Sequence, residues 1–313
     1  MKRRYGAIYA APQALWLAVF FAAPLAIIIA YSFLKKSLYG GVEPVLSLDA
    51  YKAIANPNLL IVGWRTLWVS LAATAFTILI ALPCGYSIAR SGNQALRLFL
   101  VIVPFWTNFL VRIYAWIAIL GTEGFLNDFL LALGVIADPV QFLYNQGAVI
   151  VVLVYMYLPY AILPLFSTID KFDFTLLEAA RDLGATRLQA LLKVLMPNIR
   201  GGLVTAVLFT LIPIFGAYAV PLLIGGKDSY MLGNVIADQV TKTRNWPLAS
   251  SLSMGVTVVT GVAAILFALR GRKGAPRIAE DTGLDASPGS TLVAARAVGT
   301  AAGSAAGTAG APS

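Results

Sequence analysis

Six long apolar stretches, none containing an acidic residue, constrain this chain more than any other feature of its sequence. A hydrocarbon core about 30 Å thick is crossed by roughly 20 helical residues. Because lipid offers no hydrogen-bond partners to the backbone, segments of this length and composition are expected to be helices. We therefore predict an all-α, polytopic membrane protein with spans at about 12–34, 66–89, 98–120, 148–168, 202–224 and 249–269.

The composition supports this class and excludes most enzyme chemistry. Only 12% of the residues are charged, whereas soluble domains typically have about 25%. The chain has no histidine, which excludes histidine triads and imidazole proton relays. Its single cysteine, Cys84, can form neither an internal disulfide nor a thiolate metal site. We therefore expect no catalytic residue, no bound metal and no enzymatic activity in this chain.

The distribution of basic residues predicts the orientation in the membrane. With six spans, both termini lie on one side, and the segments on that side contain 15 of the 23 Lys and Arg residues, against seven on the other side and Arg112 within a span. The positive-inside rule therefore predicts cytoplasmic termini. We expect a cytoplasmic N-terminus at 1–11, a six-span domain at 12–270, and a disordered Ala/Gly-rich cytoplasmic tail at 271–313.

The longest cytoplasmic connection, residues 170–200, has the pattern of two short helices. Asp173 or Thr175 can cap a first helix that runs through Leu183, and Gly184 can end it in the left-handed conformation. A second helix is expected to run to Pro197. Both helices have apolar stripes at helical spacing, and these stripes must be covered. Periodicity alone allows either a hairpin lying on its own membrane domain or a docking element for a cytoplasmic partner.

A motif in this connection carries a family resemblance. Glu178-Ala179-Ala180, Gly184 after three further residues, and Val194-Leu195-Met196-Pro197 after nine more resemble the EAA loop, E-A-A-x3-G-x9-I-x-L-P, of binding-protein-dependent ABC importer permeases. Val and Met replace the Ile and Leu of that pattern. The resemblance implies a type I importer (MetI-like) permease core. It also implies that this loop is the coupling helix that sits in a cleft of the ATPase subunit, through Glu178, Ala179, Ala180, Gly184 and Pro197.

Other segments resemble the first permease subunit of bacterial spermidine/putrescine importers, and the likeness covers roughly residues 12–270. These segments are Val103–Trp116, Leu177–Ala185, Gly233–Ile236 and Arg244–Pro247. The resemblance implies a multi-pass permease of the bacterial inner membrane that forms half of a polyamine pathway. Transport of another small organic solute is the alternative.

The chain is not expected to hydrolyse ATP itself. No G-x4-G-K-[ST] phosphate loop occurs, and Gly225-Gly226-Lys227 lacks the upstream glycine and the hydroxyl residue. The resemblance implies two ATP-binding subunits that use ATP and Mg, a second homologous permease subunit, and a periplasmic or lipid-anchored solute-binding protein. Membrane lipid is the other expected partner, and nucleic acid is not one.

A polyamine is a flexible polycation, so its path calls for aromatic faces and carboxylates. The candidates are Trp106, Tyr114, Trp116 and Asp238. Glu123, Asp128, Asp138 and Asp228 also lie in predicted outer segments, where such charges more often serve solvation.

An ion-coupled secondary carrier is the main rival from another class. Such carriers usually place ionisable residues within the bilayer, and here the predicted spans contain Arg112 alone. At helical spacing, Arg112 can stack on Phe105, Phe109 and Trp116, pair with a carboxylate of the partner permease, or gate the path. A channel or a lipid-modifying enzyme has no supporting motif.

Overall fold

The computed structural model describes residues 11–272. Almost all of the predicted N-terminal segment 1–11 and of the predicted tail 271–313 therefore lie outside the described residues. Within residues 11–272, five helices are long and apolar enough to cross a membrane, or six if one bent pair counts as a span. This confirms the predicted class of a helical, polytopic membrane protein.

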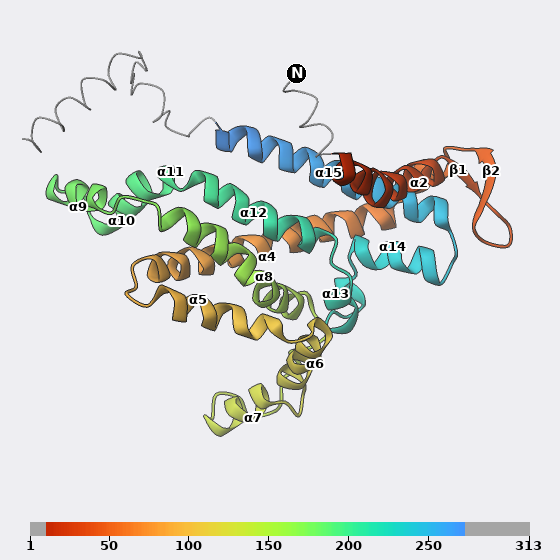
Figure 1. The fold of residues 1–313 in the computed structure, drawn as a ribbon. Helices are drawn as coiled ribbons and strands as arrows, with labels where there is room; N and C mark the ends of the chain where they lie inside the picture. The colour runs from red at the N-terminus through yellow and green to blue at the C-terminus, as the bar shows by residue number, and fades with distance from the viewer. Residues whose placement is uncertain (1–10, 273–313) are drawn as a thin grey trace, which may run out of the picture. The chain divides into compact units, whose positions relative to one another are not determined.

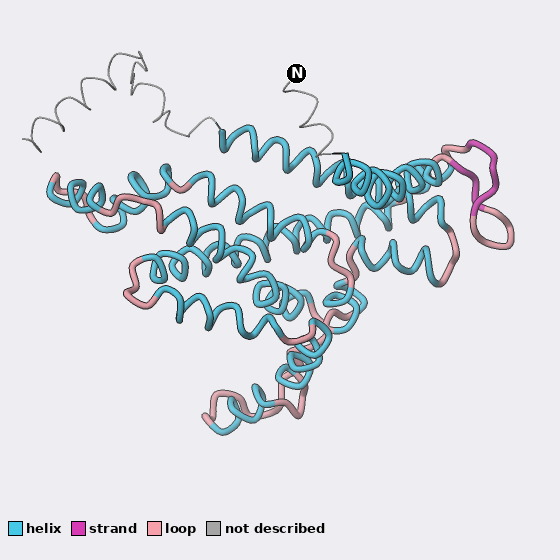
Figure 2. The backbone as a smooth tube through the Cα atoms, in the orientation of Figure 1, coloured by secondary structure: helices cyan, strands magenta, loops and turns pink. Residues whose placement is uncertain are grey.

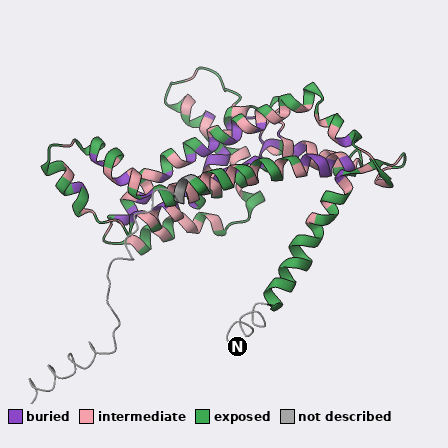
Figure 3. Cartoon of the chain, turned by 90° about the horizontal axis from the view of Figure 1, so that it is seen from above, coloured by how far each residue is buried: buried purple, intermediate pink, exposed green. Residues whose placement is uncertain are grey.

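Three neighbouring helices form the centre of the bundle, with α8 packed against both α4 and α12 (Figure 1). They are α4 (Pro57–Ala89), α8 (Gln146–Ile169) and α12 (Arg200–Phe215). Two apolar clusters are buried along them, one around Val149, Leu153 and Ile214 and one around Ile162, Leu165 and Ile199. Figure 3 shows the buried residues, in purple, along the middle of the bundle.

Small residues let these helices approach closely. A Cβ atom on Gly202 of α12 would lie 2.6 Å from Thr168 Cβ and 3.0 Å from the carbonyl oxygen of Pro164, both on α8. A Cβ atom on Gly85 of α4 would lie 3.3 Å from the backbone nitrogen of Phe166. Glycine at these crossings replaces side-chain volume with direct backbone contact, as is common between membrane helices.

The N-terminal helix Ala11–Ser32 contains a π-turn, η1 (Ala18–Ala22), followed by α2 (Ala23–Ser32). It coincides with the predicted span 12–34, and α2 packs on α15 (Trp246–Arg272). Most of its side chains are exposed, including Trp16 and Phe21, and Figure 3 shows it leaving the bundle at an angle. Its apolar surface therefore faces lipid or another chain.

The predicted third span, 98–120, is not one helix. The chain forms α5 (Gln94–Ile102) and the 3-10 turn η2 (Val103–Trp106), becomes extended at Thr107, and restarts as α6 (Phe109–Leu120). Pro104 has no N–H to continue the first helix, and the Asn108 side chain caps the second by accepting a hydrogen bond from Leu110 N at 2.8 Å.

The predicted fifth span, 202–224, also differs. Helix α12 ends at Phe215, and a separate short helix, α13 (Ala219–Leu223), follows the turn at Gly216. Pro213 and Gly216 end the helix because proline weakens its last turn and glycine disfavours continuation. The remaining predicted spans, 66–89, 148–168 and 249–269, lie within α4, α8 and α15, respectively.

A small antiparallel hairpin follows the first helix and was not predicted (Figure 2). Strand β1 (Leu34–Lys36) pairs with β2 (Val42–Leu46), and Gly40 and Gly41 in the turn have φ of 89° and 85°. Gly41 N donates to the carbonyl of Arg244 at 2.9 Å. This bond joins the hairpin to the turn between α14 (Leu232–Thr241) and α15. Four further short elements are α3 (Asp49–Ile54), α7 (Phe125–Ala132), α11 (Met196–Asn198) and η4 (Lys227–Ser229).

Candidate coupling loop and substrate path

The first helix of the connection at 170–200, α9 (Thr175–Asp182), has a defined start and end. Asp173 Oδ1 accepts hydrogen bonds from the backbone N and the Oγ1 of Thr175, at 3.0 and 2.8 Å. These bonds lower the pKa of the Asp173 carboxyl below its ordinary value. At the other end, Ala185 N donates to Ala180 O at 3.0 Å and Gly184 N to Arg181 O at 2.9 Å. This is the Schellman pattern.

Gly184 is required by that pattern. Its φ is +87°, the left-handed region that residues with a Cβ atom rarely adopt. A Cβ atom there would meet no atom within 4 Å, so the constraint comes from the backbone conformation and not from crowding. The chain can therefore reverse direction sharply between the two helices.

The second helix begins with a reciprocal cap, in which Gln189 N donates to Thr186 Oγ1 and Thr186 N donates to Gln189 Oε1. It continues through α10 (Arg187–Ala190), a π-turn η3 (Leu191–Leu195) and α11. Pro197 lies in α11, directly before the chain bends by 77° at Ile199 into α12. The motif thus ends at a corner of the backbone.

The two helices have one covered face and one free face. Leu177 and Leu195 are buried against Ile88 of α4 and Ile169 of α8. On the free face, the side chains of Leu183 and Leu188 are 90% and 65% exposed. The loop therefore lies on its own membrane domain with one face, and docking of a cytoplasmic partner stays a prediction for the other face.

An open groove of about 730 Å³ lies on this free surface. It is lined by Glu178, Arg181, Asp182, Gly184, Ala185, Thr186 and Arg187. The fold thus brings Glu178 and Gly184 of the motif together, beside the exposed Ala179. Ala180 and Pro197 are half-buried and do not line the groove.

Sequence reasoning missed the contact between α4 and this loop. The Arg90 guanidinium, just after the end of α4, lies 5.5 Å from the ring centre of Phe174 and donates to Tyr86 Oη at 3.1 Å. The hydroxyl of Tyr86, with a smaller contribution from Glu178, raises the pKa of Arg90. The spacing of Tyr86 and Arg90, four residues apart at the end of α4, signals their hydrogen bond but not the contact with Phe174.

The predicted aromatic residues of the path do not gather at one place. Trp116 packs edge-on against Tyr155 of α8 at 5.4 Å. Trp106 and Tyr114 are instead 76% and 59% exposed on the surface of this chain. Tyr155, which also stacks on Phe105 at 5.8 Å, was not among the predicted residues.

Arg112 belongs to this aromatic cluster. Its guanidinium carbon lies 4.7 Å from the ring centre of Phe105 and 6.0 Å from that of Phe109, two of the three rings on which it was predicted to stack. Its Nε and Nη1 are buried and have no hydrogen-bond acceptor among the described residues. Cation–π attraction is therefore the contact that holds this charge within the chain.

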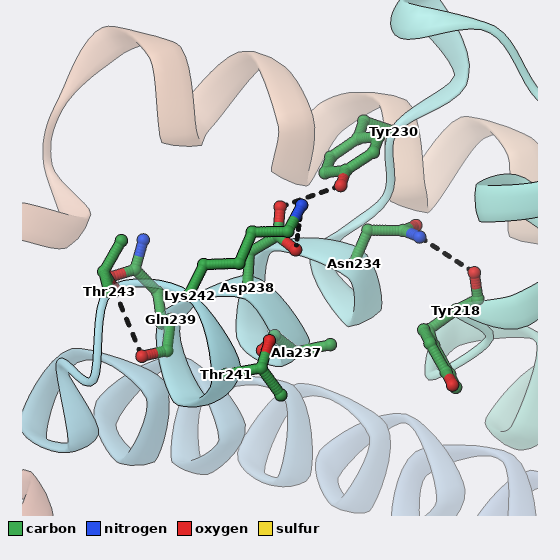
Figure 4. Close-up of polar contacts among 9 residues, drawn as sticks. All are labelled: Tyr218, Tyr230, Asn234, Ala237, Asp238, Gln239, Thr241, Lys242 and Thr243. Atoms are coloured by element: carbon green, nitrogen blue, oxygen red, sulfur yellow. Dashed lines mark hydrogen bonds and ion pairs between the residues drawn. The ribbon is translucent and has the colours of Figure 1, made fainter.

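Asp238 lies on α14, whose neighbours are α15, α13 and α4. Its Oδ1 is 2.8 Å from Lys242 Nζ, and its Oδ2 accepts a hydrogen bond from Tyr230 Oη at 2.8 Å (Figure 4). The bonds from Lys242 and Tyr230 lower the pKa of Asp238, and the Asp238 carboxylate raises the pKa of both partners. All three groups thus keep their ordinary protonation states near neutral pH.

Within residues 11–272, no three His, Cys, Asp or Glu side chains lie close enough together to hold a metal ion. The candidate sites are the exposed loop at 170–200 and the Asp238 carboxylate on α14.

Comparison with known proteins identifies the family. Residues 73–271, more than half of the chain, match the family described as binding-protein-dependent transport system inner membrane component. The spermidine/putrescine transport system permease protein PotB of Escherichia coli K12 is 38% identical over 254 residues, which are 80% of this chain and 92% of that protein. PotB of Haemophilus influenzae is 37% identical, over 80% of this chain and 89% of that protein.

Solved structures show the same fold. A chain of a bacterial ABC transporter involved in the import of the acidic polysaccharide alginate matches with a TM-score of 0.70 at 17% identity, covering 87% of this chain and 96% of that one. A chain of the MetNI methionine ABC transporter, in an inward-facing conformation, matches with a TM-score of 0.51 at 20% identity, covering 71% and 99%. This chain therefore belongs to the inner-membrane permeases of binding-protein-dependent ABC importers, and the predicted MetI-like permease core is confirmed.

Proposed function

We propose that this chain is one of two permease subunits of an ATP-driven polyamine importer in the bacterial inner membrane, and that it forms half of the translocation path. The observation that carries the substrate class is the 38% identity to PotB, a spermidine/putrescine permease, over 92% of that protein. The second permease subunit is a homologue of this chain. A periplasmic or lipid-anchored binding protein delivers the substrate, as the family description implies.

The power for transport comes from two ATP-binding subunits that use ATP and Mg. The free face of the loop supports this part of the proposal because it combines exposed leucines with the groove lined by Glu178 and Gly184. Glu178 pairs with basic groups of the ATPase, and Ala179 and Ala180 permit a close approach of the two backbones. Closure of the nucleotide-bound ATPase pair moves the loop and tilts the attached helices, which switches the cavity between inward and outward openings.

The orientation follows from the same contact. The loop must lie in the cytoplasm to meet the ATPase, and the excess of basic residues on that side supports cytoplasmic termini. Thr66 on α4 contacts α14, and Ala89 at the other end of α4 packs near the loop. These two residues are about 35 Å apart along α4, at about 1.5 Å per residue, so α14 lies on the periplasmic side.

Uptake of labelled putrescine and spermidine into proteoliposomes that contain the complete importer tests the proposal. We expect saturable uptake that requires ATP and the binding protein and that unlabelled polyamines inhibit. Uptake driven by an ion gradient without ATP would refute the importer mechanism. Stronger inhibition by another organic solute than by polyamines would refute the substrate class.

The coupling residues are tested in the same preparation. Gly184→Ala forces a side chain into the left-handed region, at a cost of roughly 1–2 kcal/mol. Gly92→Ala is the matched control because Gly92 also lies in a turn with open space around its Cβ position, but without positive φ. We expect Gly184→Ala and Glu178→Gln to reduce ATP-driven uptake while membrane insertion persists. Normal uptake by both variants would refute the assignment.

A further inference from the structure

The carboxylate of Asp238 is held by two donors of different character (Figure 4). Tyr230 offers a neutral hydroxyl to Oδ2, and Lys242 offers a primary ammonium to Oδ1, each at 2.8 Å. Asp238 shows 28% of its side chain to solvent, whereas Lys242 shows 65%. The Asp238 carboxylate is thus partly exposed, and the Lys242 ammonium that contacts it lies mostly in solvent.

The acceptor side is held rigidly. At the start of α14, Leu232 N donates to Thr66 Oγ1 of α4, and Asn234 Nδ2 donates to the carbonyl of Tyr218, each at 2.8 Å. Met231, next to Tyr230, is fully buried. These contacts fix the turn that carries Tyr230 and the helix that carries Asp238. Lys242 lies at the C-terminal end of that helix and reaches the carboxylate through a flexible side chain.

The Lys242 side chain, which contacts the Asp238 carboxylate, has the chemistry of the proposed substrate. A lysine side chain ends in four methylene groups and a primary ammonium, and putrescine consists of four methylene groups between two primary amines. A carboxylate that accepts the Lys242 ammonium at 2.8 Å can therefore accept one end of a polyamine. Exposed ion pairs between residues i and i+4 stabilise a helix only slightly, so Lys242 can be displaced easily.

We propose that Asp238 and Tyr230 form an ammonium-binding site on the periplasmic side of the permease, which Lys242 occupies in the resting state and a primary ammonium of the polyamine occupies during delivery. The inference rests on the proposed polyamine specificity. The raised pKa of Lys242 and the lowered pKa of Asp238 agree with a charged pair in the resting state.

The test measures initial uptake rates in proteoliposomes that contain the complete importer, as a function of the concentration of putrescine-loaded binding protein. Asp238→Asn removes the charge that receives the ammonium, and we expect kcat/KM to fall about tenfold. Tyr230→Phe should lower it by about threefold. Lys242→Met keeps a long side chain but vacates the site, so kcat/KM should rise by about threefold, because the substrate no longer displaces an internal cation.

The opposite signs separate this proposal from a purely structural ion pair. If the pair only stabilised α14, Asp238→Asn and Lys242→Met would both lower uptake, and that result would overturn the proposal. Lys52→Met is the matched control because Lys52 is another exposed lysine beside an acidic residue, Asp49, at 3.9 Å; it should leave kcat/KM unchanged. Absence of putrescine uptake by the unmodified importer would overturn the proposed function together with this site. Normal uptake by Asp238→Asn would overturn the site alone.

Discussion

Gly202 provides a direct test of how tightly α8 and α12 pack. In the Gly202→Ala variant, the new Cβ atom would lie 2.6 Å from Thr168 Cβ and 3.0 Å from Pro164 O, and nearest of all to Thr168 Oγ1. Rotation of Thr168 can move its hydroxyl but not its Cβ atom or the proline carbonyl. The two helices must therefore separate by several tenths of an ångström or more.

The neighbouring glycine supplies the control. Gly201 lies in the same turn of α12, and a Cβ atom there would meet nothing within 4 Å. Overpacking costs about 1–3 kcal/mol, whereas Gly→Ala in a compatible helical conformation stabilises by about 0.4–1 kcal/mol. The unfolding free energies of the two variants should therefore differ by about 1.4–4 kcal/mol, with Gly202→Ala the less stable.

Unfolding of the full chain in mixed micelles titrated with SDS, followed by far-UV circular dichroism, measures this difference. Thr168→Gly in the Gly202→Ala background removes the two nearest atoms, so it should restore part of the loss beyond its own effect in the unmodified chain. Equal stability of Gly201→Ala and Gly202→Ala would show that α8 and α12 do not meet at this crossing, and the packing argument would fail.

Two further substitutions test contacts that hold α14 and α7 in place. Thr66→Val removes the acceptor of Leu232 N–H, so it should lower the free energy of unfolding by about 1–3 kcal/mol and speed deuterium exchange of that amide. Thr77→Val is the control because it removes only a bond to Ala73 within α4, and it should leave this exchange unchanged. Equal exchange in the two variants would contradict the link. Asn127→Asp removes both donors to the carbonyls of Gly121 and Val140 at a buried position. It should lower the free energy of unfolding, measured by the same SDS titration, by about 1–3 kcal/mol or more. Asn56→Asp is the control because aspartate is also a good helix cap, and its stability should be nearly unchanged. Similar stability of these two variants would exclude the proposed role of Asn127.

Much of the fold could be predicted from local signals. Hydropathy located the long helices because membrane spans need continuous apolar sequence. The end of α9 was predicted correctly because Gly184 follows a run of helix formers, and its φ of +87° is the conformation that glycine permits. The stacking of Arg112 on Phe105 followed from helical spacing, although a break in the helix lies between the two residues.

The remaining features depend on contacts between distant residues. Pro104 and Asn108 signal a break, but the apolar residues around them give a continuous hydropathy signal. The β1–β2 hairpin is short, and its turn is held by Arg244, more than 200 residues further along the chain. In the same way, Tyr155 of α8 meets Phe105 of η2 and Trp116 of α6 only because these elements pack together. The proposed roles of Glu178, Gly184 and Asp238 remain predictions.

The bend at Ile199 has a mechanical consequence. Residues Arg187–Asn198 and Arg200–Phe215 form two arms that meet at 77°, and Ile199 at the corner is fully buried. At about 1.5 Å per residue, the arms are about 18 and 24 Å long. When the corner rotates as a rigid body, the far end of the longer arm moves about one third further than the end of the shorter one. A small displacement of the end of the shorter arm thus produces a larger sideways displacement of the far end of α12 within the membrane.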